Sequence, residues 1–291
     1  MRQTLKEETG MAREIHVEEL TNNIREMCIE TNHVLTQDMR EALETAKTRE
    51  QSQRGTQILD QLCENLRIAE KEMIPICQDT GMAVIFLEVG QDVHFFGGDL
   101  TEAVNEGVRQ GYADGYLRNS VVGDPLIRKN TRDNTPAVLY TEIVPGDQVR
   151  ITVAPKGFGS ENMSRIFMLK PADGIDGVKE AILTAVRDAG PNACPPMVVG
   201  VGIGGTFEQC ALLAKRALTR PLQDASELSH IRRLEKEMTE QLNKLGIGPG
   251  GLGGTTTVLA VKINTAATHI AGLPVAVNIC CHVNRHCERT I

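Results

Sequence analysis

The chain has 291 residues, a formal net charge of −7 and a sequence pI of about 5.6. The length suits one large domain or two smaller ones, and the acidic balance argues against non-specific binding to nucleic acid. Aromatic residues make up only 3% of the chain, which also argues against surfaces that stack single-stranded bases. The charged N-terminus has no apolar core, so a secretory signal is not expected, and no apolar run approaches the ~18 residues of a membrane span. We expect a cytoplasmic protein whose eight cysteines are reduced.

Residues from about 14 to 70 are predicted to be helical, because apolar residues recur at every third or fourth position. Pro75 is expected to end this helical section. The apolar, partly β-branched run MAVIFLEVG predicts a strand at 82–90. A helix is expected next, with Asp99 as its N-cap, followed by a polar loop over 116–135. The apolar series are Val17, Leu20, Ile24, Met27; Leu35, Met39, Leu43; and Leu59, Leu62, Leu66.

The second half of the chain alternates strand and helix patterns. Strands are expected at 149–155, 197–205, 255–263 and 273–281, and helices at 177–190, 207–220 and 226–245. The mixture predicts an α+β (mixed α/β) fold, with a helical N-terminal section at 1–70 packed on a mixed-sheet domain at 71–291. We expect these two parts to form one compact unit.

The stretch PICQDTG (75–81) places a thiol, an amide and a carboxylate side by side in a turn. Three hypotheses compete: an aspartic-protease loop, a polar turn, and one corner of a metal site. An aspartic protease needs two Asp-Thr-Gly loops because two carboxylates must share a proton, and this chain has one such loop.

Three cysteine positions lie at rigid turns or strand ends: Cys77, Cys194 in GPNACPPM, and the pair Cys280–Cys281. These thiols could ligate one metal centre, but no Cys-x-x-Cys spacing supports this, and a buried hydrophobic role is commoner for any single cysteine. The glycines of GVGIGG (200–205) fit G-x-G-x-x-G, yet no acidic strand end follows about 20 residues on, so a tight turn with close strand–helix packing is favoured. By residue type alone, His269 is structural and Arg118 lies on a solvated face.

In combination the motifs are more specific. PICQDTG, YLRNSVVGDPL, NTRDNTPAV, PKGFGSENMS, PNACPPMVVGVGIGGTFE, LGIGPGGLGG and CCHVNRH closely resemble the α-subunit of class I, iron–sulfur-dependent fumarate hydratase, from roughly residue 14 to the C-terminus. The related L(+)-tartrate dehydratase α-subunits share the Cys-Gln-Asp-Thr-Gly and Ala-Cys-Pro-Pro elements, but differ at the Tyr-Leu-Arg and Gly-Ser-Glu-Asn motifs.

The resemblance implies reversible hydration of fumarate to (S)-malate on a [4Fe–4S] cluster with three cysteine ligands and one open iron. The implied ligands are Cys77, Cys194 and Cys281, with Cys280 as the competitor for the third place. Because the chain stops soon after the last motif, we expect a β-subunit to complete the site in an α2β2 assembly. The implied substrate-binding residues are Gln78, Arg118 and Gly159, and the implied acid–base residues are Asp79 and His269.

Two alternatives stay open at this point. One is an L(+)-tartrate dehydratase or another 2-hydroxy-dicarboxylate hydro-lyase. The other belongs to a different class, a non-catalytic iron–sulfur or redox subunit, which would need only the thiols and not the polar residues around them.

Overall fold

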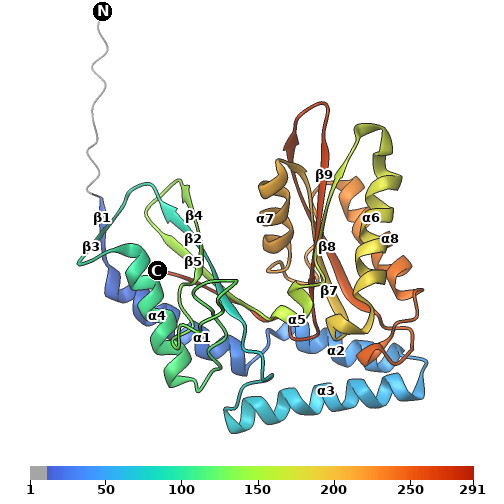
Figure 1. Cartoon of the computed structure of the whole chain (residues 1–291), viewed down its shortest axis with the longest axis horizontal. Coiled ribbons are helices and arrows are strands. Elements are labelled where there is room, and N and C mark those ends of the chain that lie inside the picture. The colour runs from blue at the N-terminus through green and yellow to red at the C-terminus, as the bar shows by residue number, and fades with distance from the viewer. Residues whose placement is uncertain (1–11) are drawn as a thin grey trace, which may run out of the picture. The chain divides into compact units, whose positions relative to one another are not determined.

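The structure is a computed structural model that describes residues 12–291; the charged N-terminal segment considered above lies mostly outside the described residues. No helix within the described range is long and apolar enough to cross a membrane. In chain order the structure contains β1 (Arg13–His16), α1 (Val17–His33), α2 (Gln37–Arg49), α3 (Gln53–Glu72), β2 (Met82–Gly90), β3 (Val93–Phe96), α4 (Leu100–Asp114), β4 (Val138–Val144), β5 (Val149–Lys156), α5 (Phe158–Glu161), β6 (Arg165–Leu169), η1 (Pro171–Asp173), α6 (Gly174–Ala189), η2 (Gly190–Ala193), β7 (Met197–Gly205), α7 (Phe207–Ala217), α8 (Ser229–Asn243), η3 (Pro249–Gly251), β8 (Val258–Thr268), β9 (Leu273–Cys280) and β10 (Cys287–Thr290) (Figure 1).

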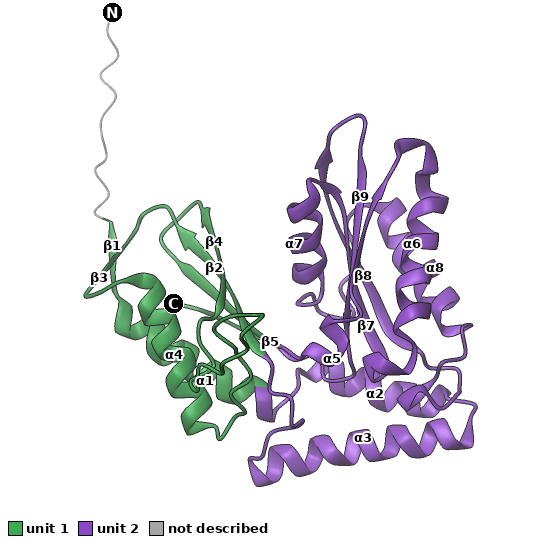
Figure 2. Ribbon diagram, in the orientation of Figure 1, with its two compact units in different colours: residues 1–31, 82–155, 287–291 green, residues 32–81, 156–286 purple. Residues whose placement is uncertain are grey.

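The chain forms two compact units (Figure 2). Unit 1 contains the described residues up to Thr31, then Met82–Pro155 and Cys287–Ile291, and unit 2 contains Asn32–Gly81 and Lys156–His286. This division differs from the single compact unit that we expected, with its helical section ending near residue 70. The helices of that section are shared, since α1 belongs to unit 1 whereas α2 and α3 belong to unit 2. The α+β class is confirmed.

Unit 1 is built on a four-stranded sheet with the order β10-β5-β2-β4. Apolar side chains of α1 and α4 pack against those of β2 and β5 to form its core. Asp99 is the N-cap of α4 as predicted, and its side chain accepts a hydrogen bond from the backbone N–H of Glu102. The predicted helical start near residue 14 is wrong by a few residues, because Arg13–His16 is β1 and pairs in parallel with β3.

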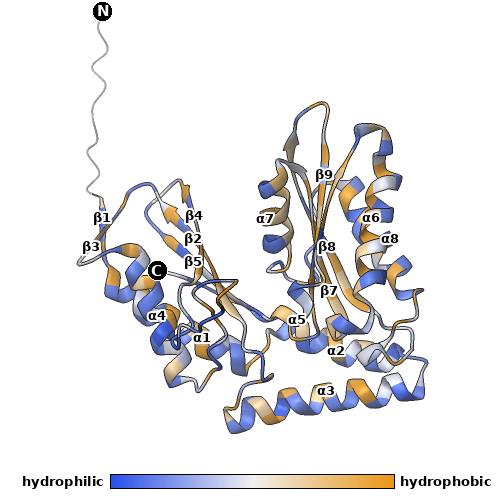
Figure 3. Cartoon of the chain, viewed as in Figure 1, coloured by the Kyte–Doolittle hydropathy of each residue, from blue (hydrophilic) through white to orange (hydrophobic). Residues whose placement is uncertain are grey.

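Unit 2 is built on a second four-stranded sheet with the order β6-β9-β7-β8. In Figure 1, α7 covers one face of this sheet, α6 and α8 cover the other, and α2 and α3 lie across one end. Figure 3 shows apolar colour concentrated along the central strands and mixed colour on the helices, as expected for amphipathic helices on a buried sheet. The predicted helical spacing is confirmed for α2 and α3, since Met39, Leu43, Leu59 and Leu66 are all buried in one cluster. Leu35 belongs to the same cluster but lies in the loop before α2.

The glycines of GVGIGG lie inside β7 rather than in a turn after it. A Cβ atom at Gly202 would lie 2.0 Å from the carbonyl oxygen of Cys210, and one at Gly200 would lie 2.2 Å from that of Ala214. Both carbonyls belong to α7, so the glycines let this helix pack directly on the strand. The hypothesis of close strand–helix packing is therefore confirmed.

The outer edge of β8 is closed by side chains of α8. Glu235, Thr239 and Asn243 follow one another at four-residue spacing, so they lie on one face of the helix. They accept hydrogen bonds from the backbone N–H groups of Ile263 (2.8 Å), Val261 (3.1 Å), and Thr257 and Val258 (2.7 and 2.9 Å), respectively. The N–H groups that an edge strand usually exposes are thus satisfied within the unit.

Candidate functional site

The PICQDTG loop connects α3 to β2 and is held to unit 2 by its backbone. The N–H of Ile76 donates to the carbonyl oxygen of Asn32 at 2.9 Å, and the side chain of Asn65 donates to the carbonyl oxygen of Ile76 at 2.9 Å. These bonds fix the backbone next to Cys77, whose side chain is half-buried, while Gln78 is exposed. The helical section ends at Glu72, close to the predicted end near residue 70 and before Pro75, with Met73 in the left-handed region at φ 50°.

Cys194 lies near Cys77. It follows η2 in a left-handed conformation, φ 51°, and is exposed. Burial of its sulfur atom and the neighbouring thiol of Cys77 both raise the pKa of Cys194, so the two sulfur atoms are close enough to interact electrostatically.

Cys281 lies near Cys194, because its neighbour His282 is hydrogen-bonded to the backbone of Cys194. The Nδ1 atom of His282 lies 3.0 Å from the carbonyl oxygen of Cys194, and the backbone N–H of His282 donates to the same oxygen at 3.4 Å. Because a carbonyl oxygen can only accept, Nδ1 must carry the proton. The segment after β9 is therefore attached to the turn that carries Cys194.

Two of the three thiols accept a hydrogen bond from the backbone two residues further along the chain. Asp79 donates to the sulfur of Cys77, and Val283 donates to the sulfur of Cys281, each at 3.4 Å. Such N–H···S bonds accompany thiolates that ligate iron–sulfur clusters. Cys281 is half-buried, whereas Cys280 is only 4% exposed and packs in the core. Of the adjacent pair, Cys281 is the thiol that lies nearer the surface.

Other cysteines have the chemistry of buried thiols. Burial raises the pKa of Cys28 to about 12 and that of Cys63 to about 11, and it also raises the pKa of Cys210 and Cys287. All four side chains lie in or against the hydrophobic core clusters, which suits a structural role.

Within residues 12–291, no group of three His, Cys, Asp or Glu side chains is arranged to hold a single metal ion. A cubane cluster makes a different demand, because each of its cysteine ligands binds a different iron atom and the thiols need not converge on one point. Three thiols at the ends of adjoining loops, two of them with backbone donors, fit that demand. The donor set is therefore compatible with a cluster.

Asp79 joins the PICQDTG loop to the turn KGFGSEN. Its Oδ1 accepts from the N–H of Gly81 at 3.0 Å, and its Oδ2 accepts from the N–H of Phe158 at 2.9 Å. Gly81 has φ +77°, and a Cβ atom there would lie 2.7 Å from the backbone of Lys156. Only glycine allows the two segments to approach so closely. The carboxylate that the sequence placed in the acid–base network thus also holds two loops together.

Gly159 lies in the first turn of α5, immediately after that junction. A Cβ atom at Gly159 would meet no other atom within 4 Å, so no protein group fills the space beside its backbone. The geometry is therefore compatible with a ligand that approaches the Gly159 N–H. Arg118 is exposed in the loop after α4 and belongs to unit 1, whereas the three thiols, Gln78 and Gly159 belong to unit 2.

His269 lies far from the thiols within unit 2. It occupies the turn between β8 and β9, where Thr268 is paired with Gly205 at the last position of β7. Cys280 is paired with Val198, near the first position of β7. Seven residues of strand separate these two pairs, or about 23 Å at the usual rise of 3.3 Å per residue. The structure does not bring His269 and Asp79 into one site within a single chain.

Sequence reasoning missed a buried charge network behind the KGFGSEN turn. Glu161 forms ion pairs with Lys215 and, at 3.4 Å, with Lys156, and it accepts a hydrogen bond from Asn278 at 2.7 Å. Lys156 also donates to Ser160 at 2.8 Å and to the carbonyl oxygen of Gly157 at 3.1 Å. The Ser-Glu-Asn motif carried the signal for Glu161, but its partners lie on α7 and β9, which sequence spacing does not connect.

Arg285 was also missed, although it stands in the quoted motif CCHVNRH. The residue is 4% exposed, and its guanidinium donates to the backbone carbonyl oxygen of Asp79. The segment after Cys281 is therefore attached both to the Cys194 turn and to the PICQDTG loop, so it links the three thiol loops.

Comparison with known proteins gives the same family throughout. The sequence profile of the family described as "Fumarate hydratase (Fumerase)" matches residues 21–290. A protein of Methanocaldococcus jannaschii with the provisional name L(+)-tartrate dehydratase subunit alpha is 40% identical over 264 residues, which cover 88% of this chain and 92% of that protein. The L(+)-tartrate dehydratase alpha subunits of Escherichia coli strain K12 and Shigella sonnei are each 32% identical over 251 residues, covering 85% of this chain and 82% of theirs.

Proposed function

The chain belongs to the fumarate hydratase (Fumerase) family, and from this membership we propose that it is the alpha subunit of an iron–sulfur hydro-lyase that interconverts fumarate and (S)-malate. The observation that carries the proposal is the placement of Cys77, Cys194 and Cys281 on adjoining loops of unit 2. Family membership supports a hydro-lyase without naming its substrate. The choice of fumarate as the substrate rests on the Tyr-Leu-Arg and Gly-Ser-Glu-Asn motifs.

We propose that Cys77, Cys194 and Cys281 hold a [4Fe–4S] cluster with one iron that has no protein ligand. When bound, such a cluster supplies a Lewis acid for the hydroxyl group and a carboxylate of a 2-hydroxy diacid. Cys28 and Cys63 lie in the hydrophobic cores of the two units, whereas the three proposed ligands lie on loops, which supports this choice of ligands.

The residues that the family motifs single out supply substrate contacts in this proposal. Gln78 is exposed next to Cys77 and offers an amide to one carboxylate of the substrate. Arg118 offers a bidentate contact to a carboxylate, for which a guanidinium is suited. Gly159 offers its backbone N–H in the open space described above. Asp79 is proposed to accept or return a proton while its carboxylate remains fixed by two backbone donors.

A partner subunit follows from the names of the relatives, which are called alpha subunits. We propose a β-subunit that completes the site, in an α2β2 assembly. His269 can belong to the acid–base network only in a site that includes a second copy of the chain, because about 23 Å of strand separates it from the thiols of its own copy.

L(+)-tartrate is the second candidate substrate, because the relatives at 40% and 32% identity are named tartrate dehydratases. The test is a comparison of kcat/KM for fumarate, (S)-malate and L(+)-tartrate, with the chain assembled anaerobically with its β-subunit. The proposal predicts the highest kcat/KM with fumarate or (S)-malate. A higher value with L(+)-tartrate would transfer the assignment to tartrate dehydration, and turnover of none of the three would leave another 2-hydroxy diacid as substrate or a redox role.

A further inference from the structure

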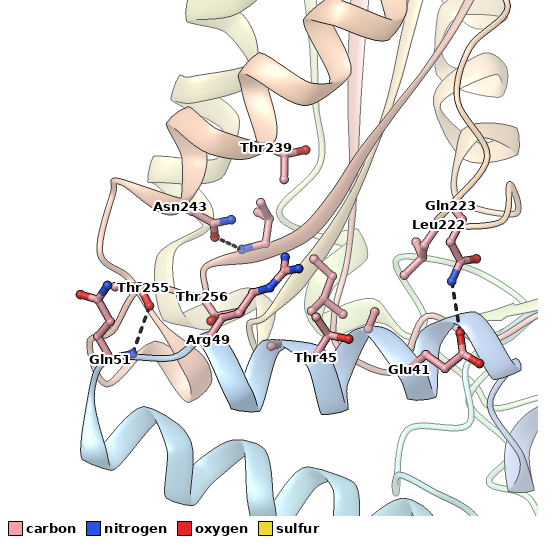
Figure 4. A pocket seen from close by; sticks show the side chains of 14 residues that line it. Glu41, Thr45, Arg49, Gln51, Leu222, Gln223, Thr239, Asn243, Thr255 and Thr256 are labelled. Atoms are coloured by element: carbon pink, nitrogen blue, oxygen red, sulfur yellow. Dashed lines mark hydrogen bonds between the residues drawn. The ribbon is translucent and has the colours of Figure 1, made fainter.

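Unit 2 contains a cavity that takes no part in the site described above. Its volume is about 530 Å³, which lies in the usual range for small-molecule sites. It lies between α2, the start of β8 and the C-terminal half of α8 (Figure 4). All its lining residues belong to unit 2: Glu41, Ala42, Thr45, Ala46, Arg49, Gln51, Leu222, Gln223, Thr239, Asn243, Thr255, Thr256, Val258 and Leu259.

Two segments that line this cavity, the end of α2 and the residues before β8, are joined by hydrogen bonds in the absence of a ligand. Glu50, which follows α2, accepts hydrogen bonds from the backbone N–H groups of Thr255 (2.8 Å) and Thr256 (2.8 Å). Burial opposes ionisation of Glu50, but these bonds and that from Ser52 outweigh it and lower the pKa of the carboxyl group. The end of α2 and the segment before β8 are thus held together at neutral pH.

The acceptors and hydroxyl groups that line the cavity are already engaged. The Oδ1 atom of Asn243 accepts from two backbone N–H groups, and Thr239 both accepts from Val261 and donates to the carbonyl oxygen of Glu235. Glu41 accepts from Gln37 at 2.7 Å and from Gln223 at 3.5 Å. A ligand therefore finds few acceptors here.

Several donors, in contrast, have no partner within residues 12–291. The guanidinium of Arg49 makes neither a hydrogen bond nor an ion pair, and in Figure 4 its side chain extends into the space between Thr45, Thr239 and Asn243. The Nδ2 atom of Asn243 and the hydroxyl group of Thr45 are also without a partner. Thr45 and Arg49 are four residues apart on α2, so they share one face of the helix.

We propose that this cavity binds a small oxyanion, a carboxylate or a phosphate, with Arg49 as the residue that holds its charge. An arginine fork matches the geometry of both groups, and the free donors around it supply further hydrogen bonds. A basic residue in the last turn of a helix is common because it interacts favourably with the helix dipole. That role requires only a positive charge and does not account for the surrounding cavity of unpaired donors.

The test measures hydrogen–deuterium exchange in peptides covering residues 41–51 and 253–259, with and without millimolar phosphate, citrate or (S)-malate. Glycerol serves as the uncharged control compound. We expect at least one of the anions, and not glycerol, to slow exchange in both peptides. Protection by phosphate alone would indicate that the ligand of the cavity is a phosphate ester. Protection by citrate or malate alone would indicate that the ligand is a carboxylate.

Two variants test whether binding of the anion in the cavity causes the protection from exchange. Arg49→Gln should weaken the apparent affinity for the protecting anion about tenfold or more, because a charge-assisted bond is lost. Arg54→Gln removes an exposed arginine that does not line the cavity and should change the affinity less than twofold. Absence of protection by all three anions, or equal affinity of Arg49→Gln and wild type, would overturn the proposal. Unchanged exchange without anion shows that Arg49→Gln remains folded.

Discussion

At the scale of single residues, the cysteine side chains differ in their solvent exposure and in whether a backbone N–H group donates to the sulfur atom. Cys194 is exposed and Cys77 and Cys281 are half-buried at loop ends, whereas Cys28 and Cys63 are buried within helices. Sequence analysis identified the three loop positions from motifs. It could not show that these loops adjoin, because the contacts of His282 and Arg285 that link them depend on tertiary structure.

We predict that Cys77→Ser, Cys194→Ser and Cys281→Ser each lose the cluster, because a serine hydroxyl is a poor ligand for iron in this setting. Cys63→Ser is the matched control, since its thiol is buried in α3 and protonated. Iron and acid-labile sulfide are measured per chain after anaerobic reconstitution. Equal iron in all four variants would contradict the ligand assignment.

We also predict a structural role for Asp79. The Asp79 carboxylate accepts hydrogen bonds from two backbone N–H groups. In Asp79→Asn the amide NH2 group faces one of these donors, so that hydrogen bond is lost. The free energy of unfolding, measured with urea, should fall by about 1–3 kcal/mol. Asp188→Asn changes an exposed side chain on α6 and should leave it unchanged. The same stability in both variants would show that Asp79 does not hold the loops.

At the scale of elements, the long amphipathic helices and the apolar strands were predictable, because their periodicity reflects burial on one face. β2 and β7 occupy the predicted residues, 82–90 and 197–205. The strands β1, β3, β4, β6 and β10 were not predicted. β10 (CERT) lies at a sheet edge and has no apolar run, so nothing in its sequence marks a strand. β6 (RIFML) is apolar, but it is a five-residue edge strand that alternates between half-buried and exposed positions, and its length alone does not mark it.

The Glu161 network connects α5 with α7 and β9 and gives a test at this scale. Burial opposes ionisation of Glu161, but the charges of Lys215 and Lys156 lower the pKa of its carboxyl group. We predict that Glu161→Gln reduces the free energy of unfolding by about 1.5–3 kcal/mol at neutral pH. Glu180→Gln, which removes an exposed pair with Arg187, should cost no more than about 1 kcal/mol.

The effect of Glu161 should depend on pH with a definite sign. Because its folded-state pKa is depressed, its contribution to stability is present above the unfolded-state value of about 4.3 and is lost as the pH falls through the folded-state value. The stability difference between wild type and Glu161→Gln should therefore shrink in acid. A difference that is independent of pH down to acid unfolding would contradict the network.

At the scale of the whole molecule, the sequence did not reveal that the chain forms two units with interleaved segments. Local patterns predict elements, but the grouping of α1 with β2–β5 and of α2 and α3 with the second sheet depends on contacts between distant segments. The same limitation applies to His269, which the family resemblance placed among the acid–base residues. The topology instead places it at the opposite end of the sheet from the thiols.

Complementation tests whether His269 serves a second copy. His269→Asn and Cys77→Ser should each be inactive when assembled alone with the β-subunit. If the two variants are coexpressed and pair at random, about one quarter of wild-type activity should return, because half of the assemblies are mixed and each has one intact site. Mixing separately assembled variants is the control. No recovered activity in the coexpressed sample would contradict a site shared between copies.

The central claim is that the three thiol loops hold a cluster that meets the substrate. The most direct measurement is iron and acid-labile sulfide per chain after anaerobic reconstitution, with visible spectra before and after addition of (S)-malate. The account predicts about four iron atoms per chain and a change in the spectrum on adding malate. A single zinc ion, or no metal, would contradict it and leave Cys77, Cys194 and Cys281 without a shared function.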